Sequence, residues 1–336
     1  MTKYLFVLTS SPKDFFCEQT LVAIASLRYH NPGAFVTLLT DDRTAETLTG
    51  NRASLKDAVD ELKVLELDEK LSPMQRSRYL KTVMRNEIDG DFLYMDSDIA
   101  VVGDLKIPEE WRGGIYAVLD FHTNLRKAIN RKKVLNAAKM LGFSPILNDE
   151  LFNGGVMFAS DTPESRAFFR KWHELWEYSV SKNYPYDMAA LAEADFSFGY
   201  KIRKMPGEWN CQLAYGKRFL PNAKVLHFFG SRIIDTCGRR VPDSMDAFLP
   251  KILRKNFYTD LKNVKARVSD GQVLFDEYHD AVIRNAKDAF LFQTKKLGVF
   301  GADVVRSYAF ARTLAFLYRK LPALLRPLEW LGKIRY

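Results

Sequence analysis

Two carboxylates stand one residue apart in the segment with the clearest chemical potential. Asp96 and Asp98 follow the apolar run 92–95 and precede a second apolar run, 99–101. The first run predicts a buried strand, which places both carboxylates at its carboxyl end. Open α/β sheets bind ligands at this edge, and divalent cations prefer carboxylate oxygens. The pair therefore indicates either a site for a divalent cation that itself holds a diphosphate or, without a metal, an Asx-type turn.

A second Asp-x-Asp triplet, Asp89-Gly90-Asp91, has a different context. It lies between the end of a predicted helix and the start of the strand at 92. Its central glycine favours a turn. We therefore interpret this triplet as structural and only the later one as a candidate site.

The segment Asn153-Gly154-Gly155 also has two interpretations. A pair of glycines tolerates positive φ and is typical of a hairpin turn just before a strand. The same missing Cβ atoms let a backbone approach a ligand closely, and the asparagine amide can bond a hydroxyl.

Three further polar residues lie at predicted ends of elements. Asp120 ends a strand, Asp187 starts a short helix, and His227 ends a late strand. Their structural interpretations are a turn former, a helix N-cap and a packed core histidine. As a functional residue, His227 would supply a neutral imidazole ligand, and Gly230 a glycine turn under a phosphate.

The elements that must position these residues alternate along the chain. Apolar runs predict strands over residues 4–8, 35–39, 64–67, 92–95, 114–119 and 224–227. Helical patterns, several with Pro or capping residues at their starts, cover residues 15–29, 55–62, 72–86, 124–141 and 161–181. This β-α-β-α-β alternation predicts a doubly wound α/β sheet.

Composition limits the class of protein. The chain has 336 residues and is 47% hydrophobic, enough for a substantial core. Its three cysteines include no Cys-x-x-Cys, which argues against a disulfide scaffold or zinc ribbon and favours a reducing compartment. The first apolar run is too short for a signal peptide, and no run is long enough to span a bilayer. We therefore expect a cytoplasmic protein.

Charge is distributed unevenly. Residues 251–336 carry 17 Lys or Arg and 8 Asp or Glu, a difference that equals the net charge of +9 of the whole chain. The preceding residues are therefore neutral overall, and the basic C-terminal region is expected to have a role of its own.

Taken in order, seven short motifs resemble the retaining glycosyltransferases of the GT-A fold. The similarity is to the family-8 type, which includes the bacterial lipooligosaccharide galactosyltransferases and glycogenin, and it spans roughly residues 3–232. The motifs are Leu8-Thr9; Arg78 and Lys81; Tyr94-Met95-Asp96-Ser97-Asp98; Asp120; Phe152-Asn153-Gly154-Gly155; Asp187-Met188-Ala189-Ala190-Leu191-Ala192; and His227-Phe228-Phe229-Gly230.

This resemblance implies a fold and a set of roles. The fold is a Rossmann-like mixed sheet flanked by helices, with a catalytic domain over residues 1–250 and a helical basic region over 251–336. The implied metal ligands, for Mn²⁺ or Mg²⁺, are Asp96, Asp98 and His227. The implied donor-binding residues are Thr9 and Asp41 near the nucleobase, Asp96 at the ribose, Arg78, Asn153, Gly154 and Gly155 at the sugar, and Gly230 and Arg232 at the diphosphate. The implied catalytic residues are Asp187, Asp120 and Asn153.

Three positions depart from the family pattern. Met188 replaces a glutamine expected beside the reacting carbon, and Ala192 replaces an asparagine. Ile233 replaces the lysine that binds the diphosphate, and Arg232 stands one position earlier. These departures concern the sugar and the diphosphate more than the metal.

The resemblance implies metal-dependent sugar transfer with retention of configuration. The donor would be a nucleotide-diphosphate sugar such as a UDP-sugar, and the acceptor a glycan or lipid-linked glycan of cell-surface polysaccharide synthesis. One alternative is a sugar-phosphate nucleotidyltransferase, which Thr9-Ser10-Ser11-Pro12-Lys13 disfavours because it is not a Gly-rich phosphate loop. Another is a non-catalytic, membrane-associated protein that binds sugar nucleotides.

The basic C-terminal region has an amphipathic pattern. Over residues 303–321 leucines and a phenylalanine fall on one side and arginines on another, and Trp330 and Tyr336 follow. This pattern predicts a helix on an anionic membrane surface, hence a protein peripheral to the inner face of the cell membrane. The alternatives are packing on the catalytic domain or in a homo-oligomer. Nucleic-acid binding is disfavoured because no nucleic-acid module accompanies the charge.

Overall fold

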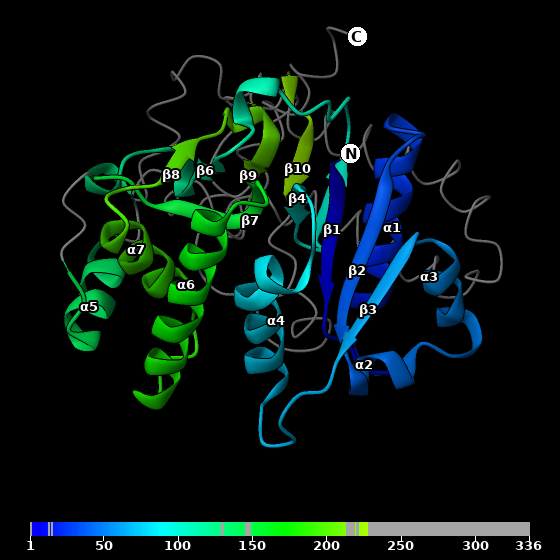
Figure 1. The fold of residues 1–336 in the computed structure, drawn as a ribbon, viewed down its shortest axis with the longest axis horizontal. Helices are drawn as coiled ribbons and strands as arrows, with labels where there is room; N and C mark the ends of the chain where they lie inside the picture. The colour runs from blue at the N-terminus through cyan, green and yellow to red at the C-terminus, as the bar shows by residue number, and fades with distance from the viewer. Residues whose placement is uncertain are drawn as a thin grey trace, which may run out of the picture.

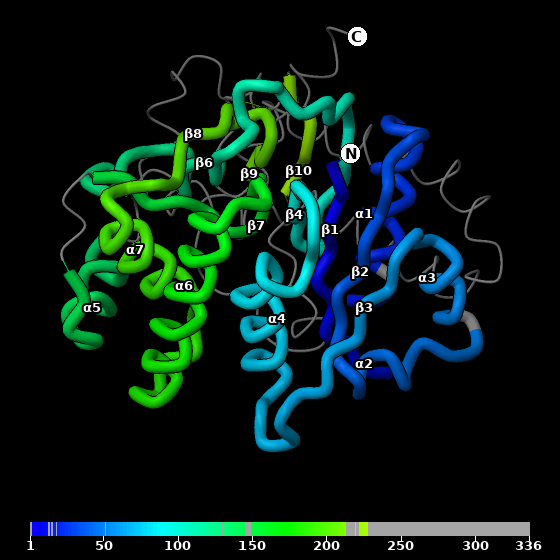
Figure 2. The backbone as a smooth tube through the Cα atoms, viewed as in Figure 1, coloured from blue at the N-terminus to red at the C-terminus, as the bar shows by residue number. Residues whose placement is uncertain are grey.

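The computed structural model describes residues 2–12, 14, 16–128, 131–144, 149–212, 219 and 222–227. Figures 1 and 2 trace the path of the chain through them. The predicted boundary at residue 250 and the predicted basic helices beyond it lie outside these residues. None of the helices in the described ranges is both long and apolar enough to cross a membrane.

A seven-stranded mixed sheet forms the centre, with strand order β3-β2-β1-β4-β7-β6-β8. The first four strands in this order are parallel, and β7 is antiparallel to both β4 and β6. The strands are β1 (Lys3–Leu8), β2 (Phe35–Asp41), β3 (Glu61–Leu65), β4 (Phe92–Met95), β6 (Ile115–Leu119), β7 (Phe152–Ala159) and β8 (Ile202–Lys204). The predicted α/β class is therefore confirmed, as a mixed sheet flanked by helices (Figure 1).

A small second sheet brings the end of the described chain back to β4. It has the order β5-β10-β9, from β5 (Ile99–Val101), β10 (Val225–His227) and β9 (Cys211–Gln212). Because β10 is antiparallel to β5, His227 lies opposite Ile99, one residue after Asp98. The sheet thus places a residue from the end of the fold beside the carboxylate pair.

Helices cover both faces of the central sheet. They are α1 (Phe16–His30), α2 (Asp42–Thr47), α3 (Ser54–Asp57), α4 (Pro73–Glu87), α5 (Arg131–Leu141), α6 (Pro163–Ser181) and α7 (Met188–Ser197). Side chains alternate along β1: Phe6 and Leu8 pack in one core with α1, and Leu5 and Val7 pack in another with α4, α6 and α7. On that second face α6 lies between α4 and α7 (Figure 1).

Two helices begin where local signals predict. At α4, the Ser72 hydroxyl accepts from the Gln75 amide and the Gln75 side chain accepts from the Ser72 amide, with Pro73 in the first turn. At α6, the N-cap is Thr162, one residue after the predicted start. Farther along α4, Lys81 reaches Asp96 at the end of β4.

Three predicted elements need correction. The helix predicted over 55–62 ends at Asp57, because Glu61 pairs with Lys3 and Thr37 and joins the edge strand β3. The basic helix predicted from 124 begins at Arg131, after a short turn at Leu125–Lys127. Asn153, Gly154 and Gly155 do not form a turn before β7 but lie within it, where the register with β6 shifts.

Candidate functional site

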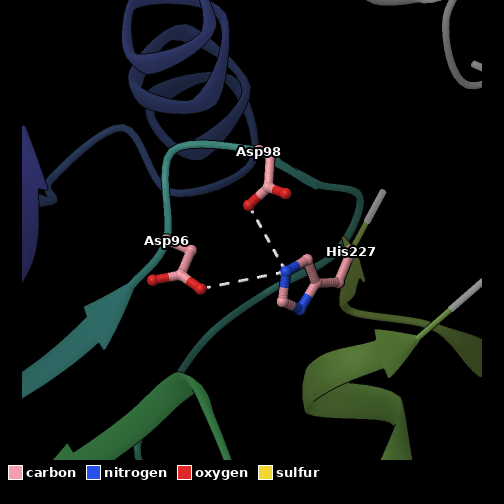
Figure 3. A group of neighbouring side chains, drawn as sticks. All are labelled: Asp96, Asp98 and His227. Carbon is pink, nitrogen blue, oxygen red and sulfur yellow. Dashed lines mark ion pairs between the residues drawn. The ribbon is translucent and has the colours of Figure 1, made fainter. Parts of the chain in front are cut away.

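Asp96, Asp98 and His227 meet at the carboxyl end of β4. His227 Nε2 lies 3.3 Å from Asp98 Oδ1 and 3.9 Å from Asp96 Oδ2. One ligand atom from each residue lies within 4.8 Å of the other two. Figure 3 shows both carboxylates on the connection between β4 and β5, with the imidazole directed at them.

The other triplet forms the predicted turn. Gly90 has φ 79°, a conformation that glycine adopts readily. Asp89 and Asp91 are engaged by Arg166 and Arg112, respectively, before the start of β4. The two Asp-x-Asp triplets therefore lie at opposite ends of the same strand.

A chain of amides orients the His227 ring. His227 Nδ1 lies 3.0 Å from Asn210 Oδ1, and Asn210 Nδ2 donates to Asn153 Oδ1 at 2.9 Å. Asn153 Nδ2 in turn donates to Asp120 Oδ1 at 2.9 Å. Because an amide oxygen only accepts, Nδ1 carries the proton and Nε2 is left to face the carboxylates. Metal-binding histidines are oriented by partners of this kind.

Two carboxylates and one imidazole make a donor set that fits a divalent cation. Oxygen ligands suit Mg²⁺ and Mn²⁺, and a single imidazole is compatible with the latter. Burial disfavours the imidazolium form of His227, but Asp98 and Asp96 outweigh burial and raise its pKa. The cluster therefore favours positive charge at this point.

Gly155 lies directly against the cluster of Asp96, Asp98 and His227. Its carbonyl accepts from the Asp96 amide at 2.7 Å. A Cβ atom here would lie 2.4 Å from His227 Cε1, 2.8 Å from Asp96 Oδ2 and 2.9 Å from Asn153 Oδ1. Residue 155 must therefore be glycine for His227 and Asp96 to lie this close. A Cβ at Gly154 would come no nearer than 3.4 Å to the end of the Lys81 side chain and 3.9 Å to Leu191 Cδ2.

Basic side chains from α4 border the same cluster. Lys81 Nζ lies 3.1 Å from Asp96 Oδ1 and 3.9 Å from Asp187 Oδ2, and Arg78 Nε lies 3.2 Å from Asp187 Oδ1. The Tyr94 hydroxyl also donates to Asp96. Burial opposes ionisation of Asp187, but Arg78 and Lys81 outweigh it and lower its pKa. The predicted donor-binding residues Arg78 and Asp96 and the predicted catalytic residue Asp187 therefore lie together.

Asp120 is a buried carboxylate that Asn153 connects to the cluster. It is 2% exposed, and its Oδ2 has no hydrogen-bond partner among the described residues. Burial raises its pKa to about 6, although the bond from Asn153 acts in the opposite direction. An unpartnered buried oxygen of this kind is suited to accept from a ligand hydroxyl.

Replacing Asp120 by asparagine is expected to raise the free energy of unfolding at about pH 8 by about 1–3 kcal/mol. The folded protein holds the Asp120 proton more tightly than the unfolded chain does. Stability therefore falls as the pH rises from about 4 to about 6, and an amide avoids this loss. Urea unfolding of both proteins at about pH 4 and about pH 8 measures the difference.

The control for this prediction is Asp195→Asn. Burial also raises the pKa of Asp195 to about 6, at the end of α7. Both variants should gain stability at the higher pH, but only Asp120→Asn should lose sugar-nucleotide binding. An equal gain for Asp120→Asn at both pH values would contradict the assignment of this carboxyl as the titrating group.

The residues predicted near the nucleobase lie at the ends of β1 and β2. Thr9 Oγ1 is buried without a hydrogen-bond partner in the described part of the chain. Asp41 is fully buried, accepts from the Thr44 amide and pairs with Arg76. Its carboxylate is thus already engaged by the protein. Gly230, Arg232 and Ile233 lie outside the described residues, so the predicted diphosphate contacts stay predictions.

The departures at Met188 and Ala192 share one apolar environment. Both side chains pack against a cluster that includes Phe121, Leu125 and Leu151. The start of α7 therefore presents a hydrophobic side chain directly after Asp187, where the resemblance implies an amide.

Two residues that position the site escaped prediction from the sequence. Asn210 and Gln212 lie in and just after a short turn, Gly207–Asn210, and both are fully buried. No periodic pattern or motif marks this segment. The one available signal is the pair of amide side chains, Asn210 and Gln212, two residues apart in a segment without a periodic pattern.

The solved structures that are similar to this chain include three glycosyltransferases. The glycosyltransferase GlyE of Streptococcus pneumoniae TIGR4 is 18% identical over 68% of this chain, with a TM-score of 0.44, and the chain spans 55% of that protein. The galactosyltransferase LgtC, in complex with donor and acceptor sugar analogs, is 15% identical, with 67% of this chain and 86% of that one covered and a TM-score of 0.45. Mouse xyloside xylosyltransferase 1 is 14% identical, with 68% and 97% covered and a TM-score of 0.44.

No protein-family profile and no curated protein matches the chain. The three similar structures are distant in sequence and in superposition, so the function proposed below rests on the site residues themselves.

Proposed function

We propose that the protein is a metal-dependent glycosyltransferase. It moves a sugar from a nucleotide-diphosphate sugar, of which a UDP-sugar is our first choice, to a glycan or lipid-linked acceptor in cell-surface polysaccharide synthesis. The observation that carries this proposal is the juxtaposition of the Asp96, Asp98 and His227 cluster with Asp120 and Asp187. Retention of configuration rests on the family resemblance alone.

Charge at the leaving group explains the arrangement. A cation held by Asp96, Asp98 and His227 would stabilise the diphosphate as it leaves. Lys81 and Arg78 add positive charge at the same edge and need no reorganisation, because Asp96 and Asp187 already hold them in place.

The residues that we expect to contact the donor sugar are mainly carboxylates. A glycosyl transition state resembles an oxocarbenium ion, which nearby carboxylates stabilise. Asp120 offers an unpartnered oxygen for a sugar hydroxyl, and Asn153 holds that carboxyl in place. Asp187 is a second carboxylate near the cluster, paired with Arg78 and close to Lys81. Gly155 leaves room for His227 and Asp96 to lie directly against the backbone of β7.

A thermal-shift panel of nucleotide sugars with and without Mn²⁺ tests the proposal. We expect at least one sugar nucleotide to raise the melting temperature, and only with the metal. Incubation of that donor should then release free sugar and nucleoside diphosphate. A nucleotidyltransferase would instead need pyrophosphate and release a sugar phosphate, and a non-catalytic binding protein would shift without hydrolysis. No shift with any donor would contradict the proposal.

We also propose that the basic C-terminal region attaches the enzyme to an anionic membrane surface on the cytoplasmic side. Deleting residues 304–336 should abolish co-sedimentation with anionic vesicles, since each basic residue near such a surface contributes about 1 kcal/mol. Neutral vesicles are the control. Binding that survives the deletion would show that the attachment lies elsewhere.

A further inference from the structure

The loop that carries Asp120 has an unfavourable backbone. Phe121 and His122 follow it with φ of 60° and 53°, so two consecutive residues other than glycine are left-handed. Such conformations are costly and persist only where neighbouring contacts hold them. Something outside the loop must therefore fix the direction in which Asp120 points.

The Gln212 side chain makes that contact. The Phe121 amide donates to Gln212 Oε1 at 2.9 Å, and Gln212 Nε2 donates to the Leu119 carbonyl at 2.9 Å. One amide thus bridges the residues on both sides of Asp120. The Gln212 backbone amide also donates to His122 Nε2 at 2.9 Å.

The same segment reaches the candidate cation cluster. Gln212 lies opposite His227 in the parallel pairing of β9 with β10. Asn210, two residues earlier, faces His227 Nδ1 at 3.0 Å and donates to Asn153. Residues 210–212 therefore contact both His227 of the cation cluster, which lies on the small sheet, and the loop of Asp120, which follows β6 of the central sheet.

We propose that Gln212 is a positioning residue, which sets the Asp120 carboxyl at a fixed place relative to the cation cluster. This inference rests on the proposed function, in which Asp120 contacts the donor sugar. Gln212 then contributes to recognition of the sugar but not of the nucleoside diphosphate. A purely structural Gln212, which only satisfies buried backbone groups, would affect both ligands equally.

Two variants separate these roles. Gln212→Met is similar in size and removes both side-chain hydrogen bonds to the loop. Gln212→Glu keeps an acceptor for the Phe121 amide but loses the donor to Leu119. The matched control is Ser160→Ala. It removes a partly buried hydrogen bond from the Gly113 amide to the buried Ser160 hydroxyl. These residues lie just before β6 and just after β7, at the ends of these strands away from the site.

Calorimetry in Mn²⁺ should measure the affinity for UDP and for the sugar nucleotide with the largest thermal shift. We expect Gln212→Met to lower the ratio of the sugar-nucleotide affinity to the UDP affinity about tenfold, while the UDP affinity changes less than about twofold. Gln212→Glu should fall between Gln212→Met and wild type, and Ser160→Ala should leave the ratio unchanged.

Equal losses for both ligands, or an unchanged ratio, would overturn the positioning role. If Gln212→Met does not fold, the same ratio in Gln212→Glu decides between the two roles. A wild-type protein that binds UDP with Mn²⁺ but binds none of the sugar nucleotides would refute the proposed function, and with it this inference. The two failures are therefore distinguishable from the wild-type measurement.

Discussion

Replacing Asp98 by asparagine is expected to weaken metal-dependent nucleotide binding about 100-fold while the protein stays folded. The Asp98 carboxylate lies 3.3 Å from His227 Nε2 and is one of three candidate ligands. Asparagine keeps the shape but offers a neutral oxygen in place of the charge that hard cations prefer. Loss of even an outer partner of a metal ligand costs about 10- to 100-fold. Calorimetric titration of UDP with and without Mn²⁺ measures the effect.

The chain supplies a matched control in its other triplet. Asp89→Asn makes the same chemical change at a turn whose aspartate is paired with Arg166 at the surface. This variant should bind nucleotide and metal as wild type does. If Asp98→Asn also binds as wild type does, the cluster at residues 96, 98 and 227 is not the metal site.

Replacing Gly155 by alanine is expected to lower sugar transfer by about 100-fold or more and to destabilise the protein by about 1–3 kcal/mol. The new Cβ would lie 2.4 Å from His227 Cε1 and 2.8 Å from Asp96 Oδ2. Both atoms belong to candidate metal ligands, so relief of the overlap must displace at least one of them. Donor hydrolysis with Mn²⁺ and thermal melting measure the two effects.

Gly154→Ala is the control for this change. Its Cβ would meet Lys81 Cε at 3.4 Å and Lys81 Nζ at 3.5 Å, the end of a flexible side chain. We expect at most a few-fold loss of activity from Gly154→Ala. Similar losses for the two alanine variants would mean that the strand as a whole, and not the contact with the cluster, is sensitive at these positions.

Local signals in the sequence predicted the elements that carry the carboxylates. The strand over residues 92–95 matches β4, because its short apolar run is bounded by the turn at Gly90 and by Asp96. The start of α4 matches because Ser72 and Pro73 act within one helical turn. Such signals depend only on residues close in sequence, so the residues themselves determine the outcome.

The Asn153-Gly154-Gly155 segment shows where local reasoning fails. Glycine pairs favour turns, but this one lies within β7, paired with β4 on one side and shifted in register against β6 on the other. Glycine is needed at 155 because His227 and Asp96 lie too close for a Cβ there. That reason involves a residue more than seventy positions away, which a local pattern does not contain.

The sequence alone thus determines the α/β class, the strand that ends at Asp96 and the types of side chain available for a cation and a sugar. The sheet topology decides which of these side chains lie together. The strand β10 pairs with β5, which places His227 beside Asp98. The folded chain also adds the amides of Asn210 and Gln212, which orient His227 and the Asp120 loop. Hydrogen bonds between segments this far apart depend on how the sheets pack, so they follow from the tertiary structure and not from spacing along the chain.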